Sequence, residues 1–217
     1  MRMEKTIRFI LASGSPRRIQ MMRDKGFDPV IFPSNADENT PVSGGGVETV
    51  MYLALKKALD VAEKYKASQS ENFSSNDPEV KNCKKCIEGL IIAADTLVLY
   101  NNEIMGKPVD FDDGFNMLSK LRGKAHEVVT GVCLYDLLSE RKRVFYEETK
   151  VHFKDYTDKE LTEYLLTDEA YDKAGGYAIQ GEFKKYIKQI EGDYNNVVGF
   201  PWDRIEKEIK IFLGGLK

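Results

Sequence analysis

The sequence contains few of the residues that mark disulfide-rich or membrane-embedded proteins. Only three cysteines occur in 217 residues, and no apolar run reaches the roughly 18 residues that a membrane-spanning helix needs. An odd and small number of cysteines is typical of a reducing compartment. The first residues have neither the apolar core nor the cleavage site of a signal peptide. We therefore expect a cytoplasmic protein with no membrane partner.

A large excess of charge of one sign is also absent. The chain has 32 Lys and Arg residues against 35 Asp and Glu residues, which gives a net charge of −3. Proteins that bind nucleic-acid polymers usually have a basic face and a high isoelectric point, so no such partner is expected. A few well-placed cations could still hold a small anion. The 42% apolar and 31% charged residues are an ordinary balance for a globular protein.

The hydrophobic pattern alternates between strand-like and helix-like segments, which predicts one α/β domain over residues 1–217. Residues 67–87 are rich in Ser, Asn, Lys and Glu, and we expect them to form a flexible insertion. The expected strands are 6–12, 28–33, 90–99, 103–105, 126–136, 143–153 and a strand near 183–190. The expected helices are 16–25, 47–66, 111–121, 158–166 and a C-terminal helix opened by Pro201.

The first candidate site is the strand-to-helix junction Ser13-Gly14-Ser15-Pro16-Arg17-Arg18. Ser15 is a plausible N-cap, and proline is favoured at the first position of a helix. The free N–H groups and the dipole of a helix N-terminus attract anions, and hydroxyl and guanidinium groups donate well to phosphate oxygens. The alternative is a capped helix with solvated arginines.

The second candidate is Asp95-Thr96, inside an otherwise apolar strand. A carboxylate there is costly to bury unless it is paired or binds a metal ion. A buried charge in a cleft is a frequent feature of functional sites. The alternative is an aspartate at a strand end that caps a loop.

Two further segments could contact a ligand. Gly106-Lys107-Pro108 follows the Asp95 hairpin, although it is not a P-loop because Pro108 replaces the required Ser or Thr. The segment from Asp172 to Gly181 is rich in small residues, and Gln180 within it offers both hydrogen-bond donors and acceptors. The alternatives are a solvated lysine and a glycine-rich turn without a ligand.

Three other features are interpreted as structural. Cys83 and Cys86 have the spacing of a redox or zinc motif, but a second pair is missing. His126 and His152 are flanked mostly by strand residues and have no neighbours that suggest a nucleophilic triad. The adjacent lysines at 56–57 would normally be surface charge.

Taken together, the ordered segments resemble the Maf family of nucleotide pyrophosphatases, and the resemblance covers nearly the whole chain. The matching segments are Leu11–Arg18, Asp37-Glu38, Lys57-Ala58, Ala94-Asp95-Thr96, Gly106-Lys107-Pro108, Thr130-Gly131-Val132, Asp172–Gly181 and Gly192–Pro201.

The resemblance implies a mixed-sheet α/β fold with a cleft between two lobes, similar to inosine triphosphate pyrophosphatases. It also implies a homodimer, a small-molecule nucleotide substrate and a divalent cation, Mg²⁺ or Mn²⁺. Asp95 would activate the attacking water, and Glu38 and Asp95 would hold the metal ion. The residues expected to contact the triphosphate are Ser13, Ser15, Arg17, Lys57 and Lys107.

Arg17, Thr96 and Gln180 match the subgroup of the family that resembles dTTP/UTP pyrophosphatases. An amide such as Gln180 could pair with a uracil or thymine edge. The resulting hypothesis is a pyrophosphohydrolase with a house-cleaning role that cleaves dTTP, UTP or modified pyrimidine triphosphates to the monophosphate and pyrophosphate. Two alternatives stay open: a nucleotide-binding regulator of cell division or septum formation, and a relative that prefers purines such as ITP.

Overall fold

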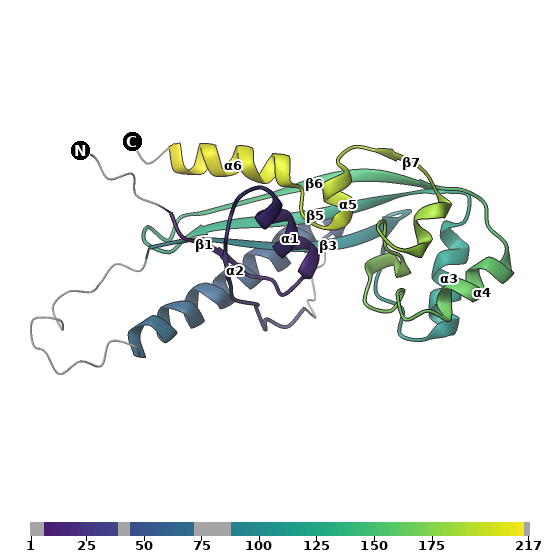
Figure 1. The fold of residues 1–217 in the computed structure, drawn as a ribbon, viewed down its shortest axis with the longest axis horizontal. Helices are drawn as coiled ribbons and strands as arrows, with labels where there is room; N and C mark the ends of the chain where they lie inside the picture. Colours follow the sequence, from purple (N-terminus) through teal and green to yellow (C-terminus); the bar gives the residue numbers. More distant parts are fainter. Residues whose placement is uncertain (1–6, 39–43, 72–87, 215–217) are drawn as a thin grey trace, which may run out of the picture.

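A mixed β-sheet forms the centre of the computed structural model, which describes residues 7–38, 44–71 and 88–214 (Figure 1). Its strand order is β2-β1-β3-β5-β6-β7, and β4 pairs with β3. The pairs β1–β2 and β1–β3 are parallel and the others are antiparallel, so the predicted mixed α/β fold is confirmed. The strands are β1 Phe9–Leu11, β2 Val30–Ile31, β3 Leu90–Tyr100, β4 Glu103–Met105, β5 Ala125–Asp136, β6 Lys142–Phe153 and β7 Ile187–Glu191.

Strand β3 is covered on both faces, as its continuous apolar run predicts. Successive side chains of a strand point to opposite faces. Accordingly, Ile91 and Ala93 pack with the long helix α2 (Gly46–Glu71), whereas Ile92 and Ala94 pack with the C-terminal helix α6 (Trp202–Gly214). This alternation decides on which face each polar residue further along the strand will lie.

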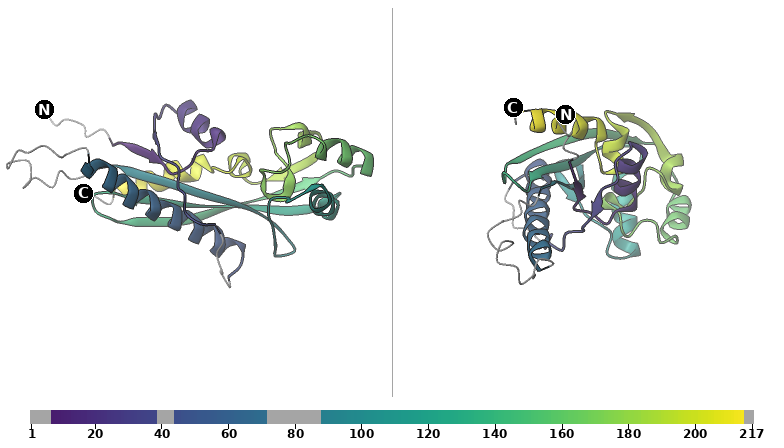
Figure 2. Two further views of the ribbon diagram at one scale, coloured as in Figure 1. Left: turned by 90° about the horizontal axis from the view of Figure 1, so that it is seen from below. Right: turned by 60° about the vertical axis from the view of Figure 1, so that its left-hand side comes forward.

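The helices form two groups joined by the long strands β3, β5 and β6 (Figure 1, Figure 2). Helices α1 (Pro16–Asp24), α2 and α6 lie at one end of the sheet. Helices α3 (Phe111–Leu121) and α4 (Asp158–Leu165) lie at the other end, around a separate aromatic-rich core. Within the described ranges, no helix is long and apolar enough to cross a membrane.

Several predicted boundaries are wrong. Helix α2 continues to Glu71, five residues beyond the predicted end at 66, so residues 67–71 are helical; the flexibility of the predicted insertion stays a prediction. Cys83, Cys86 and the rest of that segment from 72 to 87 lie outside the described residues. Near 183–190 the chain first forms a 3₁₀ helix, Glu182–Tyr186, and only then strand β7. The first two strands are also shorter than expected, because only Phe9–Leu11 and Val30–Ile31 pair in the sheet.

The absence of a side chain at Gly131 lets helix α2 pack closely against strand β5. A Cβ atom at this position of β5 would lie 2.3 Å from the carbonyl oxygen of Val50 on α2. We expect Gly131→Ala to push the helix away and to lower stability by about 1–3 kcal/mol, as overpacking does. Thermal unfolding would measure this as a lower Tm. Gly214→Ala is the control, because nothing lies within 4 Å of its added Cβ; equal melting of the two variants would contradict the argument.

Candidate active site

A pocket of about 500 Å³ opens beside strand β3, between helices α1 and α2 and the loop that follows β4. Segments distant in the sequence line it, including the first strand-to-helix junction, α2, β3 and the glycine-rich segment after residue 171. Nearly all predicted site residues are brought together there: Ser13, Ser15, Arg17, Glu38, Lys57, Asp95, Thr96 and Lys107. Gln180 is the exception, since its side chain is exposed and is not among the lining residues.

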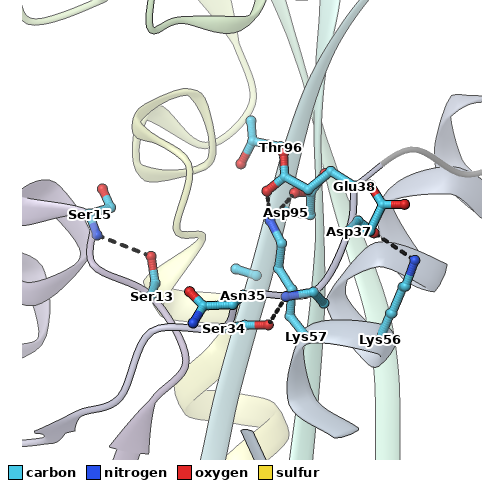
Figure 3. A network of polar contacts seen from close by, with 12 residues as sticks. Ser13, Ser15, Ser34, Asn35, Asp37, Glu38, Lys56, Lys57, Asp95 and Thr96 are labelled. Atoms are coloured by element: carbon cyan, nitrogen blue, oxygen red, sulfur yellow. Dashed lines mark hydrogen bonds and ion pairs between the residues drawn. The ribbon is translucent and has the colours of Figure 1, made fainter. Parts of the chain in front are cut away.

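Asp95 lies on the α2 face of β3, as the alternation from Ala93 requires, and is only 7% exposed. Its Oδ1 accepts a hydrogen bond from Lys57 Nζ on α2 at 2.6 Å. The same ammonium group is 2.7 Å from Oε1 of Glu38, which belongs to the loop after β2 (Figure 3). Two carboxylates from different segments therefore converge on one largely buried lysine.

The ammonium group of Lys57 stabilises the ionised form of Glu38. The hydrogen bond from Lys57 holds the pKa of Glu38 below its usual value, and the charges of Lys107 and Arg18 act in the same direction. Glu38 is therefore ionised at neutral pH.

The interpretation of Lys57 as ordinary surface charge is wrong, because its side chain is 13% exposed and bonded to both acids.

Arg18 belongs to the first candidate segment, but sequence reasoning assigned it no role separate from Arg17; in the structure it lines the pocket and bonds to two other segments around it. Its guanidinium group donates to the carbonyl oxygens of Gly199 at 2.9 Å and Ala94 at 2.8 Å, and to Thr96 Oγ1 at 3.1 Å. Burial lowers the pKa of Arg18, and the nearby Asp95 carboxylate opposes this shift. The apolar Met22, four residues later, was the available signal in the sequence, since residues i and i+4 share a helix face, and Met22 is buried in the structure.

Thr96 points to the opposite face of β3 from Asp95. Besides accepting from Arg18, its hydroxyl lies 3.0 Å from Oγ1 of Thr130 on β5. Thr130 in turn donates to the carbonyl oxygen of Asn196, in the short helix α5 (Tyr194–Val198). The predicted specificity residue Thr96 is thus held in a hydrogen-bonded network while it also lines the pocket.

The junction before α1 has the expected helix start. Ser15 is the N-cap and Pro16 the first helical residue, but the Ser15 side chain makes no capping hydrogen bond. The backbone N–H of Ser15 instead donates to Ser13 Oγ at 3.2 Å (Figure 3). Both serines and Arg17 line the pocket, at the positive end of the α1 dipole.

The glycine-rich segment closes the opposite wall. Gly175 and Gly176 have φ values of +72° and +73°, which residues with side chains rarely adopt. The Gly175 N–H donates to the carbonyl oxygen of Gly106 at 2.9 Å, and so joins this wall to the loop of Lys107. Asp172, to which the sequence assigned no separate role, also lines the pocket, and its contact with Lys173 lowers its pKa.

The donor atoms suit a hard divalent cation. Among the described residues, no group of three or more His, Cys, Asp and Glu side chains is placed to hold a metal ion. Two carboxylates, Glu38 and Asp95, nevertheless converge at Lys57. Mg²⁺ is commonly held by one or two carboxylates, with water and substrate phosphates as the other ligands, so this pair fits such an ion.

Comparison with known proteins agrees with the geometry. The sequence model of the family described as Maf-like protein matches residues 8–212. This chain belongs to the Maf family. Within the family, a protein from Caldicellulosiruptor bescii named dTTP/UTP pyrophosphatase is 42% identical, over 91% of both chains.

Other Maf relatives carry the same name. A dTTP/UTP pyrophosphatase from Ruminiclostridium cellulolyticum is 38% identical over 90% of this chain and 91% of its own. One solved structure, a nucleoside-triphosphatase/dITP/XTP pyrophosphatase from Mycobacterium abscessus, aligns with a TM-score of 0.37 at 12% identity, over 68% of this chain and 74% of that one. Because this TM-score is low, the family assignment depends on the sequence match.

Proposed function

We propose that this Maf protein is a nucleoside triphosphate pyrophosphohydrolase that cleaves dTTP and UTP to the monophosphate and pyrophosphate. One observation carries the proposal: the Asp95–Lys57–Glu38 cluster faces the donors Ser13, Arg17 and Lys107 across one pocket. The names of relatives that align along nearly their whole length support the same reaction.

The cluster can perform the chemistry as follows. Asp95 takes a proton from a water molecule as the oxygen of that water attacks the α-phosphorus. The bond between that phosphorus and the bridging oxygen breaks, and pyrophosphate leaves. Cationic side chains and the N–H groups at the start of α1 stabilise the charge that develops on the phosphate oxygens. A divalent cation held by Glu38 and Asp95 would neutralise further phosphate charge.

The remaining wall suits the nucleoside. It is mainly apolar and is formed by Val98, Val128, Tyr177, Ala178, Ile179 and Val197. Small-molecule sites generally combine such a wall with a few polar groups that fix orientation. Arg17 and Thr96 are placed to contribute to specificity, whereas the exposed Gln180 would have to turn inward to contact a base. The pyrimidine preference therefore depends on the relatives and on these two lining residues.

The proposal includes three finer statements that the family resemblance implies. The cation is Mg²⁺ or Mn²⁺, the protein is a homodimer, and it acts in the cytoplasm. The first of these follows from the oxygen donors of Glu38 and Asp95, which are hard ligands.

A substrate panel tests the function directly. With Mg²⁺ present, dTTP and UTP are expected to yield monophosphate and pyrophosphate faster than CTP, ITP or 7-methyl-GTP, and EDTA is expected to abolish the reaction until Mg²⁺ is restored. Separation of the products by ion-exchange chromatography measures both results. Release of inorganic phosphate in place of pyrophosphate would contradict the proposal, and so would nucleotide binding without turnover over hours.

A further inference from the structure

The strongest unexplained feature next to the pocket is a buried histidine–tyrosine pair. His126 on β5 is fully buried, and its Nε2 lies 2.7 Å from the hydroxyl oxygen of Tyr177. Tyr177 follows the two glycines with positive φ and is one of the residues that line the pocket. The pair therefore connects a rigid central strand to the glycine-rich wall of the site.

This arrangement is not what stability alone would favour. Polar groups are costly to bury, and Nδ1 of His126 has no hydrogen-bond partner among the described residues. Replacing both members of such a pair with apolar groups of the same shape is often nearly neutral. Phe153, whose ring centroid is 4.6 Å from that of His126 and 4.8 Å from that of Tyr177, shows that aromatic side chains fit this environment.

Protonation of His126 does not disturb this bond near neutral pH. Burial, with a smaller contribution from the charge of His152, lowers the pKa of His126 to about 3. The imidazole is therefore neutral at neutral pH and is not a general acid or base there. Its position also argues against a direct catalytic role, because His126 is not among the residues that line the pocket.

We propose that His126 is a positioning residue that holds Tyr177, and through it the segment 172–179, in the shape that receives the nucleoside part of the substrate. The Gly175 N–H within this segment donates to the carbonyl oxygen of Gly106 at 2.9 Å, so its amide reports whether the segment keeps its place. The inference depends on the proposed function for the identity of the ligand, but the placement of the wall can be measured without any ligand.

His126→Phe tests the proposal, because it keeps an aromatic ring and removes the hydrogen bond. We expect KM for dTTP to rise about tenfold, the change that the loss of one net hydrogen bond produces, with little change in kcat. Inhibition by inorganic tripolyphosphate, which can fill only the phosphate part of the site, should stay unchanged. If His126 only stabilised the fold, the variant would weaken the binding of dTTP and of tripolyphosphate alike. Unchanged KM, or equal weakening of both ligands, would overturn the proposal.

Two companion variants sharpen the test. Tyr177→Phe removes the other partner of the same bond, so it should raise KM similarly, and the double variant should lose no more than either single one. It also replaces His126→Phe as the test if that variant does not fold. His152→Gln is the matched control, since His152 pairs with Glu191 on β7 and does not line the pocket. A KM increase in the control equal to that in His126→Phe would count against the proposal.

Hydrogen exchange separates this inference from the proposed function. In His126→Phe without nucleotide, the Gly175 amide should exchange faster than in the wild type, because the segment that presents it is no longer held. Unaltered exchange would refute the positioning role. If the wild type hydrolyses no nucleotide, the proposed function fails, and the exchange result still decides whether His126 holds the wall.

Discussion

Asp95→Asn is expected to reduce turnover of dTTP by about 100- to 10,000-fold, the range over which a general base contributes. The amide cannot accept the proton that the attacking water must lose. Its oxygen can still accept the hydrogen bond that Lys57 Nζ donates at 2.6 Å in the wild type. The shape of the cluster should therefore survive, and the loss should appear in kcat more than in KM.

Steady-state kinetics with a chromatographic assay of pyrophosphate would measure this loss, and thermal unfolding would verify that the variant is folded. Asp112→Asn is the control, because that carboxylate is exposed on α3 and does not line the pocket. Full activity of Asp95→Asn would remove Asp95 as the base and with it the central step of the proposed mechanism.

Lys57→Met is expected to reduce kcat/KM for dTTP by about 100- to 1,000-fold, the cost of removing one preorganised group that stabilises developing charge. The methionine retains most of the aliphatic stem, so packing against β3 and β5 should change little. Without the ammonium group, Glu38 and Asp95 face each other uncompensated, and the pKa of Glu38 should return toward its usual value because Lys57 is the largest cause of its depression.

The neighbouring lysine provides a matched control. Lys56 lies on the same helix, but its Nζ donates to the backbone carbonyl oxygen of Asp37 at 2.6 Å and does not line the pocket (Figure 3). Lys56→Met should therefore leave kcat/KM nearly unchanged, since exposed polar contacts of this kind contribute little. Equal losses in both variants would show that the effect comes from the charge of the helix and not from the cluster.

The local elements were largely predictable because their signals lie within short stretches of sequence. The apolar run before Asp95 indicated a strand covered on both faces, and β3 has that environment. Pro16 and Gly26 marked the two ends of the first helix, and Gly26 has the positive φ of +84° that favours glycine there. The C-terminal boundary of α2 was predicted wrongly, because the polar composition that suggested an insertion does not prevent a helix from continuing.

The site was predictable as a set of residues but not as a set of contacts. The motifs named Glu38, Lys57 and Asp95, yet nothing in their spacing shows that one ammonium group bonds both carboxylates. Likewise, residue type does not distinguish Arg17 from Arg18, and the family resemblance indicated only Arg17. Only the face of α1 against the sheet decides that Arg18 is the one that bonds to Gly199 and Thr96.

By itself, the sequence determined where most strands and helices lie and which acidic, cationic and hydroxyl side chains are candidates for the site, because hydrophobic period and residue type are local properties. The tertiary structure decided which of these groups meet. The packing of α2 over Gly131 brings Lys57 to Asp95. The hydrogen bond between Tyr177 and His126 connects the opposite wall of the pocket to β5. Such distances depend on how whole elements pack, so no local pattern contains them.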